Sequence, residues 1–138
     1  MSKIIYLTRR ETFSAAHRLH SEELSEEENA RFFGKCNNKY GHGHNYTLYV
    51  TVRGAVDPKT GVLVNLSDLK RIIRELVTDR FDHRHLNEDV EEFKTLNPTA
   101  ENIAIVIWEL LKPHVDSLYE IKLEETANNV AIYRGESV

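Results

Sequence analysis

The sequence predicts an α+β fold with the element order ββααββ, in which a four-stranded antiparallel sheet carries two helices on one face. Segments rich in β-branched and aromatic residues stand near both ends of the 138-residue chain. Two segments between them repeat apolar residues at helical spacing. No linker or internal repeat interrupts the chain, so we expect residues 1–138 to form one domain.

The first strand and a short helix open this order. Residues 3–17 are β-rich. The pattern Ser25-x-x-Glu28 is a capping box, which predicts a helix that runs to about Phe33. Gly34 then supplies the residue type that commonly ends a helix.

The second strand follows a polar loop. Residues 45–52 are enriched in β-branched and aromatic side chains, which predicts a long strand. Residues 57–61 contain Asp-Pro and Gly and predict a turn. We expect residues 62–64, Val-Leu-Val, to continue the sheet.

Two amphipathic helices come next, each with apolar residues at i, i+3, i+4, i+7 and i+8. The apolar faces consist of Leu69, Ile72, Ile73, Leu76 and Val77 in the first helix and of Ile103, Val106, Ile107, Leu110 and Leu111 in the second. Thr99 or Asn97 is expected to cap the second helix.

The chain is expected to end in a hairpin. Residues 119–126 and 130–133 are predicted strands, joined at Asn128-Asn129, which tolerate the positive φ of a tight turn. Helices on one face leave the other face and the edges of the sheet uncovered. Residues 46–52 are apolar or aromatic at positions of both parities, so we expect both faces to be buried, one of them by oligomerisation.

The composition excludes several classes of protein. Apolar residues make up 41% and charged residues 29% of the chain, which excludes a disordered protein. The net charge is −4 and no basic face is visible, so no nucleic-acid partner is expected. No apolar run approaches the roughly 20 residues that span a bilayer, so no membrane partner is expected. Residues 1–6 lack the apolar core of a signal peptide, which predicts a cytoplasmic protein.

Three histidines form a candidate metal site. In His42-Gly43-His44, residues i and i+2 of a strand project from one face. His17 would join them if the first two strands pair as a hairpin. Three neutral imidazoles and an open fourth position describe a catalytic zinc site. The alternative is a solvated strand end, and spacing alone does not decide between the two.

The single cysteine, Cys36, lies in a polar loop just before this motif, and it has no partner for an internal disulfide. It is open to three interpretations: a fourth zinc ligand that closes a structural site, a small buried apolar residue, or a base or nucleophile. In the last case, a neighbouring cation and a histidine would favour the thiolate.

Further acidic and imidazole groups are candidates for proton transfer. Asp82-His83 follows the first amphipathic helix. Adjacent residues in an extended segment point apart, so Asp82 need not contact His83 directly and is expected to orient a neighbour through a turn. Charges that balance the helix dipole are an equal alternative. Glu101 and Glu125 look ordinary by themselves.

Taken together, these motifs resemble the 6-pyruvoyltetrahydropterin synthase family over nearly the whole chain. The matching motifs are Thr12-Phe13-Ser14-Ala15-Ala16-His17-Arg18-Leu19, Phe33-Gly34-Lys35-Cys36-Asn37-Asn38, Gly41-His42-Gly43-His44-Asn45, Asp82-His83-x-x-Leu86-Asn87, Glu101-Asn102 and Glu125-Thr126. The resemblance implies the tunnelling (T-) fold. In that fold, four-stranded sheets join into a twelve-stranded barrel in a trimer, and two trimers form a homohexamer with active sites at subunit interfaces.

The resemblance also assigns the site. It implies that His17, His42 and His44 bind Zn²⁺ and that Cys36 is the proton acceptor and not a ligand. His20 and His85 are expected to stand away from the metal.

The remaining assignments concern the relay and the substrate. Asp82 and His83 match relay residues, with His83 reaching the cysteine of an adjacent subunit. Glu125 matches the residue that anchors the pterin ring and also belongs to the relay. Thr99 and Glu101 match positions of the substrate pocket.

The implied reaction converts 7,8-dihydroneopterin triphosphate into 6-pyruvoyltetrahydropterin and triphosphate, a lyase step of tetrahydrobiopterin biosynthesis. One alternative is 6-carboxytetrahydropterin synthase of the queuosine pathway, whose signature places three residues between the cysteine and His-Gly-His where this chain has five. Ala100 departs from the Thr-Thr-Glu of animal enzymes. A non-catalytic zinc- or pterin-binding module is the other alternative. Charge alone selects Arg18, Lys35 and Arg84 as candidates for triphosphate binding.

Overall fold

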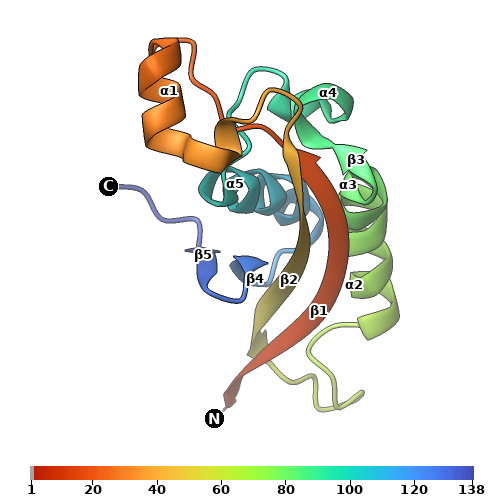
Figure 1. The fold of residues 1–138 in the computed structure, drawn as a ribbon. Coiled ribbons are helices and arrows are strands. Elements are labelled where there is room, and N and C mark those ends of the chain that lie inside the picture. The colour runs from red at the N-terminus through yellow and green to blue at the C-terminus, as the bar shows by residue number, and fades with distance from the viewer. Residues whose placement is uncertain (1) are drawn as a thin grey trace.

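A computed structural model describes residues 2–138 (Figure 1). Two long curved strands, β1 (Ile4–His17) and β2 (His42–Ala55), pair antiparallel along their full length. β4 (Leu118–Thr126) pairs antiparallel with β2, and β5 (Asn129–Tyr133) pairs antiparallel with β4. The four long predicted strands and the ββααββ order of the long elements are confirmed.

The sheet has a fifth strand that the sequence did not indicate. The two-residue strand β3 (Arg84–His85) pairs in parallel with Ala15 and Ala16 of β1, which gives the sheet order β3-β1-β2-β4-β5. The sheet is therefore mixed and five-stranded, not purely antiparallel and four-stranded. The extra strand forms because the chain leaving the first helical region runs along the open edge of β1.

Helices and helical turns fill the connections. Their bounds are α1 (Glu26–Phe33), η1 (Gly34–Asn37), α2 (Leu66–Ile73), η2 (Arg74–Thr78), α3 (Asp79–Phe81), α4 (Leu86–Asp89), η3 (Glu91–Phe93), α5 (Ala100–Leu111) and η4 (Lys112–His114). The predicted capping box of α1 is present in both of its hydrogen bonds, and Gly34 ends the helix. Thr99, not Asn97, caps α5. The first predicted amphipathic helix is continuous from α2 to α3 through one π-helical stretch, η2.

Two local predictions are wrong. Residues 62–64 form no strand. Leu63 instead packs over Gly54 of β2, where the missing side chain leaves room for it. In the β4–β5 hairpin, Asn128 and Asn129 both keep negative φ. A register irregularity between Glu124 and Thr126 accommodates the turn instead.

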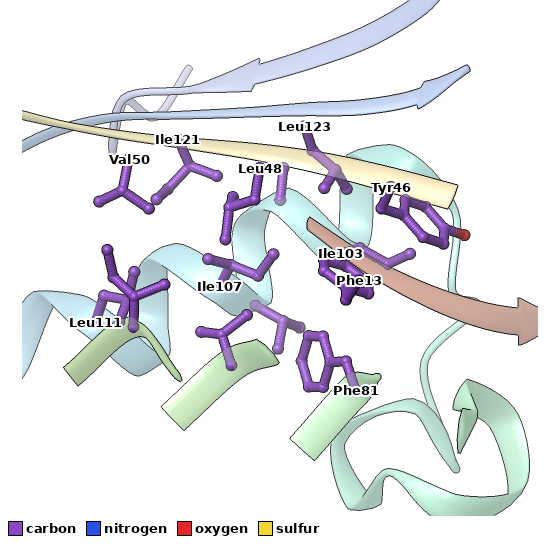
Figure 2. Close-up of a cluster of buried hydrophobic side chains, with 14 of the residues drawn as sticks. Phe13, Tyr46, Leu48, Val50, Phe81, Ile103, Ile107, Leu111, Ile121 and Leu123 are labelled. Carbon is purple, nitrogen blue, oxygen red and sulfur yellow. The ribbon is translucent and has the colours of Figure 1, made fainter. Parts of the chain in front are cut away.

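The core lies between one face of the sheet and the helices α2, α3 and α5 (Figure 2). Strand residues such as Leu48 and Leu123 meet Ile107 of α5, and all three are fully buried. Phe13 stacks on Tyr46 with ring centroids 4.9 Å apart and meets Phe81 edge-on at 5.7 Å. This packing fixes the ends of β1 and β2, where the candidate site lies.

The opposite face of the sheet carries polar and aromatic side chains. Across β1 and β2 it presents pairs such as Tyr6 with Arg53 and Thr8 with Thr51, and the Thr8 and Thr51 hydroxyls lie 2.7 Å apart. Within the described chain no helix is long and apolar enough to cross a membrane.

Candidate active site

Three histidines meet where β1 and β2 end side by side. His17 lies opposite His42 in the antiparallel register, and His44, opposite Ala15, projects from the same face. One ring nitrogen from each histidine lies within 4.8 Å of the other two. The predicted hairpin pairing is confirmed, and it brings the three side chains together.

The free nitrogens of this cluster are buried. The Nε2 atoms of His17, His42 and His44 are all enclosed and have no hydrogen-bond partner among residues 2–138, which the structure describes. His17 is fully buried, and its Nδ1 lies 2.7 Å from the carbonyl oxygen of Pro98. Because a carbonyl only accepts, Nδ1 carries the proton and donates it, which leaves the Nε2 lone pair free.

Burial also favours the neutral form of two of these imidazoles, those of His17 and His42. It lowers the pKa of His17 to about 4, and the neighbouring histidines act in the same direction, whereas the bond to Pro98 opposes the shift. Burial and the nearby His44 likewise lower the pKa of His42. Neutral imidazoles with grouped, unpartnered nitrogens are the donor set that zinc takes in catalytic sites.

Cys36 lies in η1, half-buried and with a free thiol. It is outside the group of ligand atoms that lie within 4.8 Å of one another, which among the described residues consists of the three histidines. Burial, followed by the negative charge of Glu125, raises the pKa of its thiol. The expected effect of a neighbouring cation and a histidine, which would favour the thiolate, is absent in the single chain, where burial and then Glu125 of β4 act in the opposite direction.

Asp82 and His83 form a direct pair, with Asp82 Oδ2 2.9 Å from His83 Nδ1. The contact is possible because His83 is left-handed, with φ of 59°, so the two side chains turn toward each other. Ser14 of β1 holds this turn: its N–H donates to Asp82 Oδ1 at 2.8 Å, and its carbonyl accepts from the His83 N–H at 2.6 Å. The bond from Ser14 is the first cause of the lowered pKa of Asp82. The His83 side chain is 82% exposed.

Glu125 connects the histidines to a pocket. Its Oε1 lies 3.9 Å from His44 Nε2, and both side chains are 14% exposed. A pocket of about 550 Å³ is lined by Glu125 together with Thr99 and Glu101. Thr99 uses its hydroxyl to accept the Asn102 N–H as the cap of α5. Three residues selected from the sequence thus line one hollow that adjoins the histidine cluster.

Comparisons with known proteins agree over almost the full length. The family model described as 6-pyruvoyl tetrahydropterin synthase matches residues 6–136. The chain belongs to this family. The protein named 6-pyruvoyl tetrahydrobiopterin synthase from Drosophila melanogaster is 50% identical over 137 residues, covering 96% of this chain and 80% of the fly protein. The human protein of the same name is 48% identical over 132 residues, covering 94% of this chain and 91% of that one.

Solved structures agree with this assignment. The 6-pyruvoyl tetrahydropterin synthase of Caenorhabditis elegans superimposes with a TM-score of 0.93 at 48% identity, covering 98% of each chain. The Plasmodium falciparum enzyme has a TM-score of 0.69 at 19% identity, covering 99% of this chain and all of that one, and shows a shared fold.

Two residues near the cluster were given no functional role by the sequence analysis. Tyr46 is fully buried, its hydroxyl lies 3.4 Å from His17 Nδ1, and its pKa is raised by burial and by Glu125. Its position two residues after His44, on the same face of the strand, indicates from the sequence that Tyr46 lies near the histidines. His85 is outside the histidine group, as expected, but its Nδ1 is buried without a partner, and its ring contributes to the lowered pKa of His17.

The cations selected for triphosphate binding do not gather in one place. Arg18 lines a pocket of about 650 Å³, whereas Arg84 lines a separate one of about 420 Å³ with His44 and His83. Lys35 is exposed on η1.

Proposed function

We propose that this chain is a zinc-dependent 6-pyruvoyl tetrahydropterin synthase that converts 7,8-dihydroneopterin triphosphate into 6-pyruvoyltetrahydropterin and triphosphate. Membership of the family makes it an enzyme of pterin biosynthesis. The observation that carries the proposal is the set of three buried, unpartnered Nε2 atoms beside the pocket that contains Glu125.

The three histidines would hold the metal. Buried polar atoms without a partner are costly, and a cation shared by three neutral imidazoles removes that cost. When bound, zinc would acidify the carbon-bound hydrogens next to the substrate hydroxyls and, by its charge, lower the pKa of the Cys36 thiol. The bond from His17 Nδ1 to Pro98 supports this role, since it fixes the ring and its tautomer.

Cys36 would act as the base. Its exclusion from the histidine group leaves the thiol free for proton transfer. The thiolate removes a proton from a side-chain carbon of the substrate, and the electron pair expels triphosphate from the neighbouring carbon. The resulting enol becomes the ketone of the middle side-chain carbon as a proton adds to the carbon that lost triphosphate. The alcohol next to the ring becomes the second ketone as its carbon-bound and hydroxyl hydrogens move to the adjacent carbon and nitrogen of the ring, so atoms balance without water or an external oxidant or reductant.

Glu125, Thr99 and Glu101 would bind the pterin. A carboxylate accepts hydrogen bonds from the adjacent N–H groups of an aminopyrimidinone edge, and Glu125 lies at the junction of the pocket and the histidines. A pterin ring bound at that position would direct the substrate's own side chain toward the metal.

Asp82 and His83 would relay protons across a subunit interface. Asp82 orients the imidazole of His83, which is 82% exposed in the single chain and therefore available to a neighbour. We propose a trimer in which the polar sheet faces line a twelve-stranded barrel, and a homohexamer of two trimers. Closure would also cover the open edge of β5 and the part of the β1 edge that β3 does not pair with.

The experiment is incubation of the zinc-loaded protein with 7,8-dihydroneopterin triphosphate, followed by mass identification of the pterin product. We expect 6-pyruvoyltetrahydropterin and free triphosphate. A 6-carboxytetrahydropterin product would favour the queuosine-pathway enzyme instead. Binding of the pterin without turnover would favour a non-catalytic module.

A further inference from the structure

Asparagine side chains hold the four residues that follow His17. Residues 18–21 have no regular secondary structure. Each of them is hydrogen-bonded through its backbone to a different asparagine. The pairs are Arg18 with Asn87, Leu19 with Asn37, His20 with Asn97 and Ser21 with Asn29.

Two of these pairs are reciprocal. Asn87 accepts the Arg18 N–H at 2.8 Å and donates to the Arg18 carbonyl at 2.9 Å. Asn29 does the same with Ser21, at 2.8 Å in both directions, and also donates to two further carbonyls near the start of α1. A planar amide can satisfy both backbone groups of one residue, as a neighbouring strand would. Residues 18–21 therefore form a template, a backbone segment to which the asparagines of other segments are hydrogen-bonded.

Asn37 bonds the loop that contains Cys36, residues 34–41, to this template. Its Nδ2 donates to the Leu19 carbonyl at 2.7 Å and to His20 Nδ1 at 3.0 Å. Its own carbonyl accepts from Arg18 Nε at 3.1 Å, and the carbonyl of Cys36 accepts from the Leu19 N–H at 2.7 Å. Cys36 and Asn37 are thus bonded at four points to the three residues after a histidine of the cluster.

Little else holds this loop in place. The turn η1 has only four residues and no side-chain cap at its start. It begins at Gly34 and is followed by Gly41, and both glycines have positive φ. Lys35, Asn38 and Lys39 are exposed. Without the side chain of Asn37, two of the four bonds are lost.

We propose that Asn37 is a positioning residue that fixes the Cys36 thiol relative to the histidine cluster. The proposal rests on the proposed role of Cys36 as the base. Proton transfer needs the thiol within about 3 Å of the hydrogen it removes, and a misplacement of about 1 Å costs about 100-fold in rate. Asn37 touches no reacting atom and acts through the loop.

Asn37→Ala and the similarly shaped Asn37→Leu test this in the zinc-loaded protein. We expect kcat to fall about 10- to 100-fold with KM changed less than threefold, and zinc to stay at the wild-type content. Because the thiol is half-buried, its alkylation by iodoacetamide, followed by mass spectrometry at pH 8, should speed up at least threefold in both variants.

Asn29→Ala is the matched control, with Asn29→Ser if the alanine variant does not fold. It removes bonds of the same kind from the same template, but α1 carries no residue of the proposed chemistry. It should lower the melting temperature and leave kcat and alkylation within twofold of wild type. Equal losses of kcat in the Asn29 and Asn37 variants, or unchanged alkylation in the Asn37 variants, would overturn the proposal.

The two proposals fail in different ways. If Cys36→Ala retains turnover, the role of Cys36 as the base is wrong, whereas the alkylation rates still measure whether Asn37 holds the loop. If Cys36→Ala is inactive but Asn37→Ala has wild-type kcat, the positioning role is wrong and the base assignment stands.

Discussion

Removal of the proposed zinc ion is expected to lower the free energy of unfolding, and the size of the loss can be worked out from the three histidines that would hold it. Metal removal leaves the Nε2 atoms of His17, His42 and His44 buried without a partner. Each buried, unsatisfied polar atom costs about 1–3 kcal/mol, so three cost about 3–9 kcal/mol. A ligand present at about 1,000 times its dissociation constant stabilises the folded state by about 4 kcal/mol, which lies within that range.

This free energy converts into a shift of the melting temperature. The entropy of unfolding is about 2.1 cal/mol/K for each residue, which for a chain of 138 residues is about 0.29 kcal/mol/K. A stabilisation of about 4 kcal/mol therefore corresponds to about 14 °C. The shift should appear when metal-free protein is scanned calorimetrically with and without zinc at fixed protein concentration.

Two variants make this measurement specific. His44→Ala removes one ligand and should abolish most of the zinc-induced shift. His20→Ala should retain it, because His20 bonds to Asn37 and lies outside the cluster. An identical shift in wild type and His44→Ala would refute the reasoning, since zinc would then bind elsewhere. The absence of any shift in wild type would refute it as well.

Four further outcomes are expected. Cys36→Ala should keep its zinc content and fold but lose about 100- to 10,000-fold in kcat, measured by product formation; loss of zinc would indicate a ligand instead. In the metal-free protein, the pKa of His17 is lowered to about 4, so the unfolded chain binds the proton more readily. The contribution of His17 to the free energy of unfolding should be fully present above a pH of about 6.5 and should fall by about 3 kcal/mol by pH 4. Urea unfolding should show this loss in the wild type and not in His17→Gln. Inactive Cys36→Ala and His83→Ala subunits refolded together should regain activity, and no recovery in verified mixed hexamers would exclude a shared site. Ile107→Ala should cost about 2–5 kcal/mol in urea unfolding, and a cost below about 1 kcal/mol would contradict the packing of α5.

Most of the fold could be predicted because its long elements are marked locally. The apolar spacing of α5 and the capping box of α1 are local in sequence and were both confirmed. The strand predicted at residues 62–64 is wrong because β propensity does not show whether a neighbouring strand is available to pair with the segment. β3 could not be foreseen either, since its pairing depends on contacts between Ser14 and residues 68 or more positions away.

The site was predictable to a similar extent. The pairing of His17 with His42 follows from strand geometry once the hairpin is assumed. The environment of Cys36 could not be predicted because both causes of its raised pKa, first the burial of the thiol and then the charge of Glu125 on β4, depend on tertiary packing. The direct bond between Asp82 and His83 needed a left-handed residue, which only the tertiary contacts with β1 explain.

The central claim is that three histidines hold zinc while Cys36 stays free for chemistry. Zinc-edge X-ray absorption of the loaded protein tests it most directly, because nitrogen and sulfur ligands lie at different distances. We predict three nitrogen scatterers at about 2.0–2.1 Å, no sulfur scatterer, and an unchanged spectrum in Cys36→Ala. A sulfur scatterer at about 2.3 Å that disappears in Cys36→Ala would contradict the account and indicate a closed, structural site.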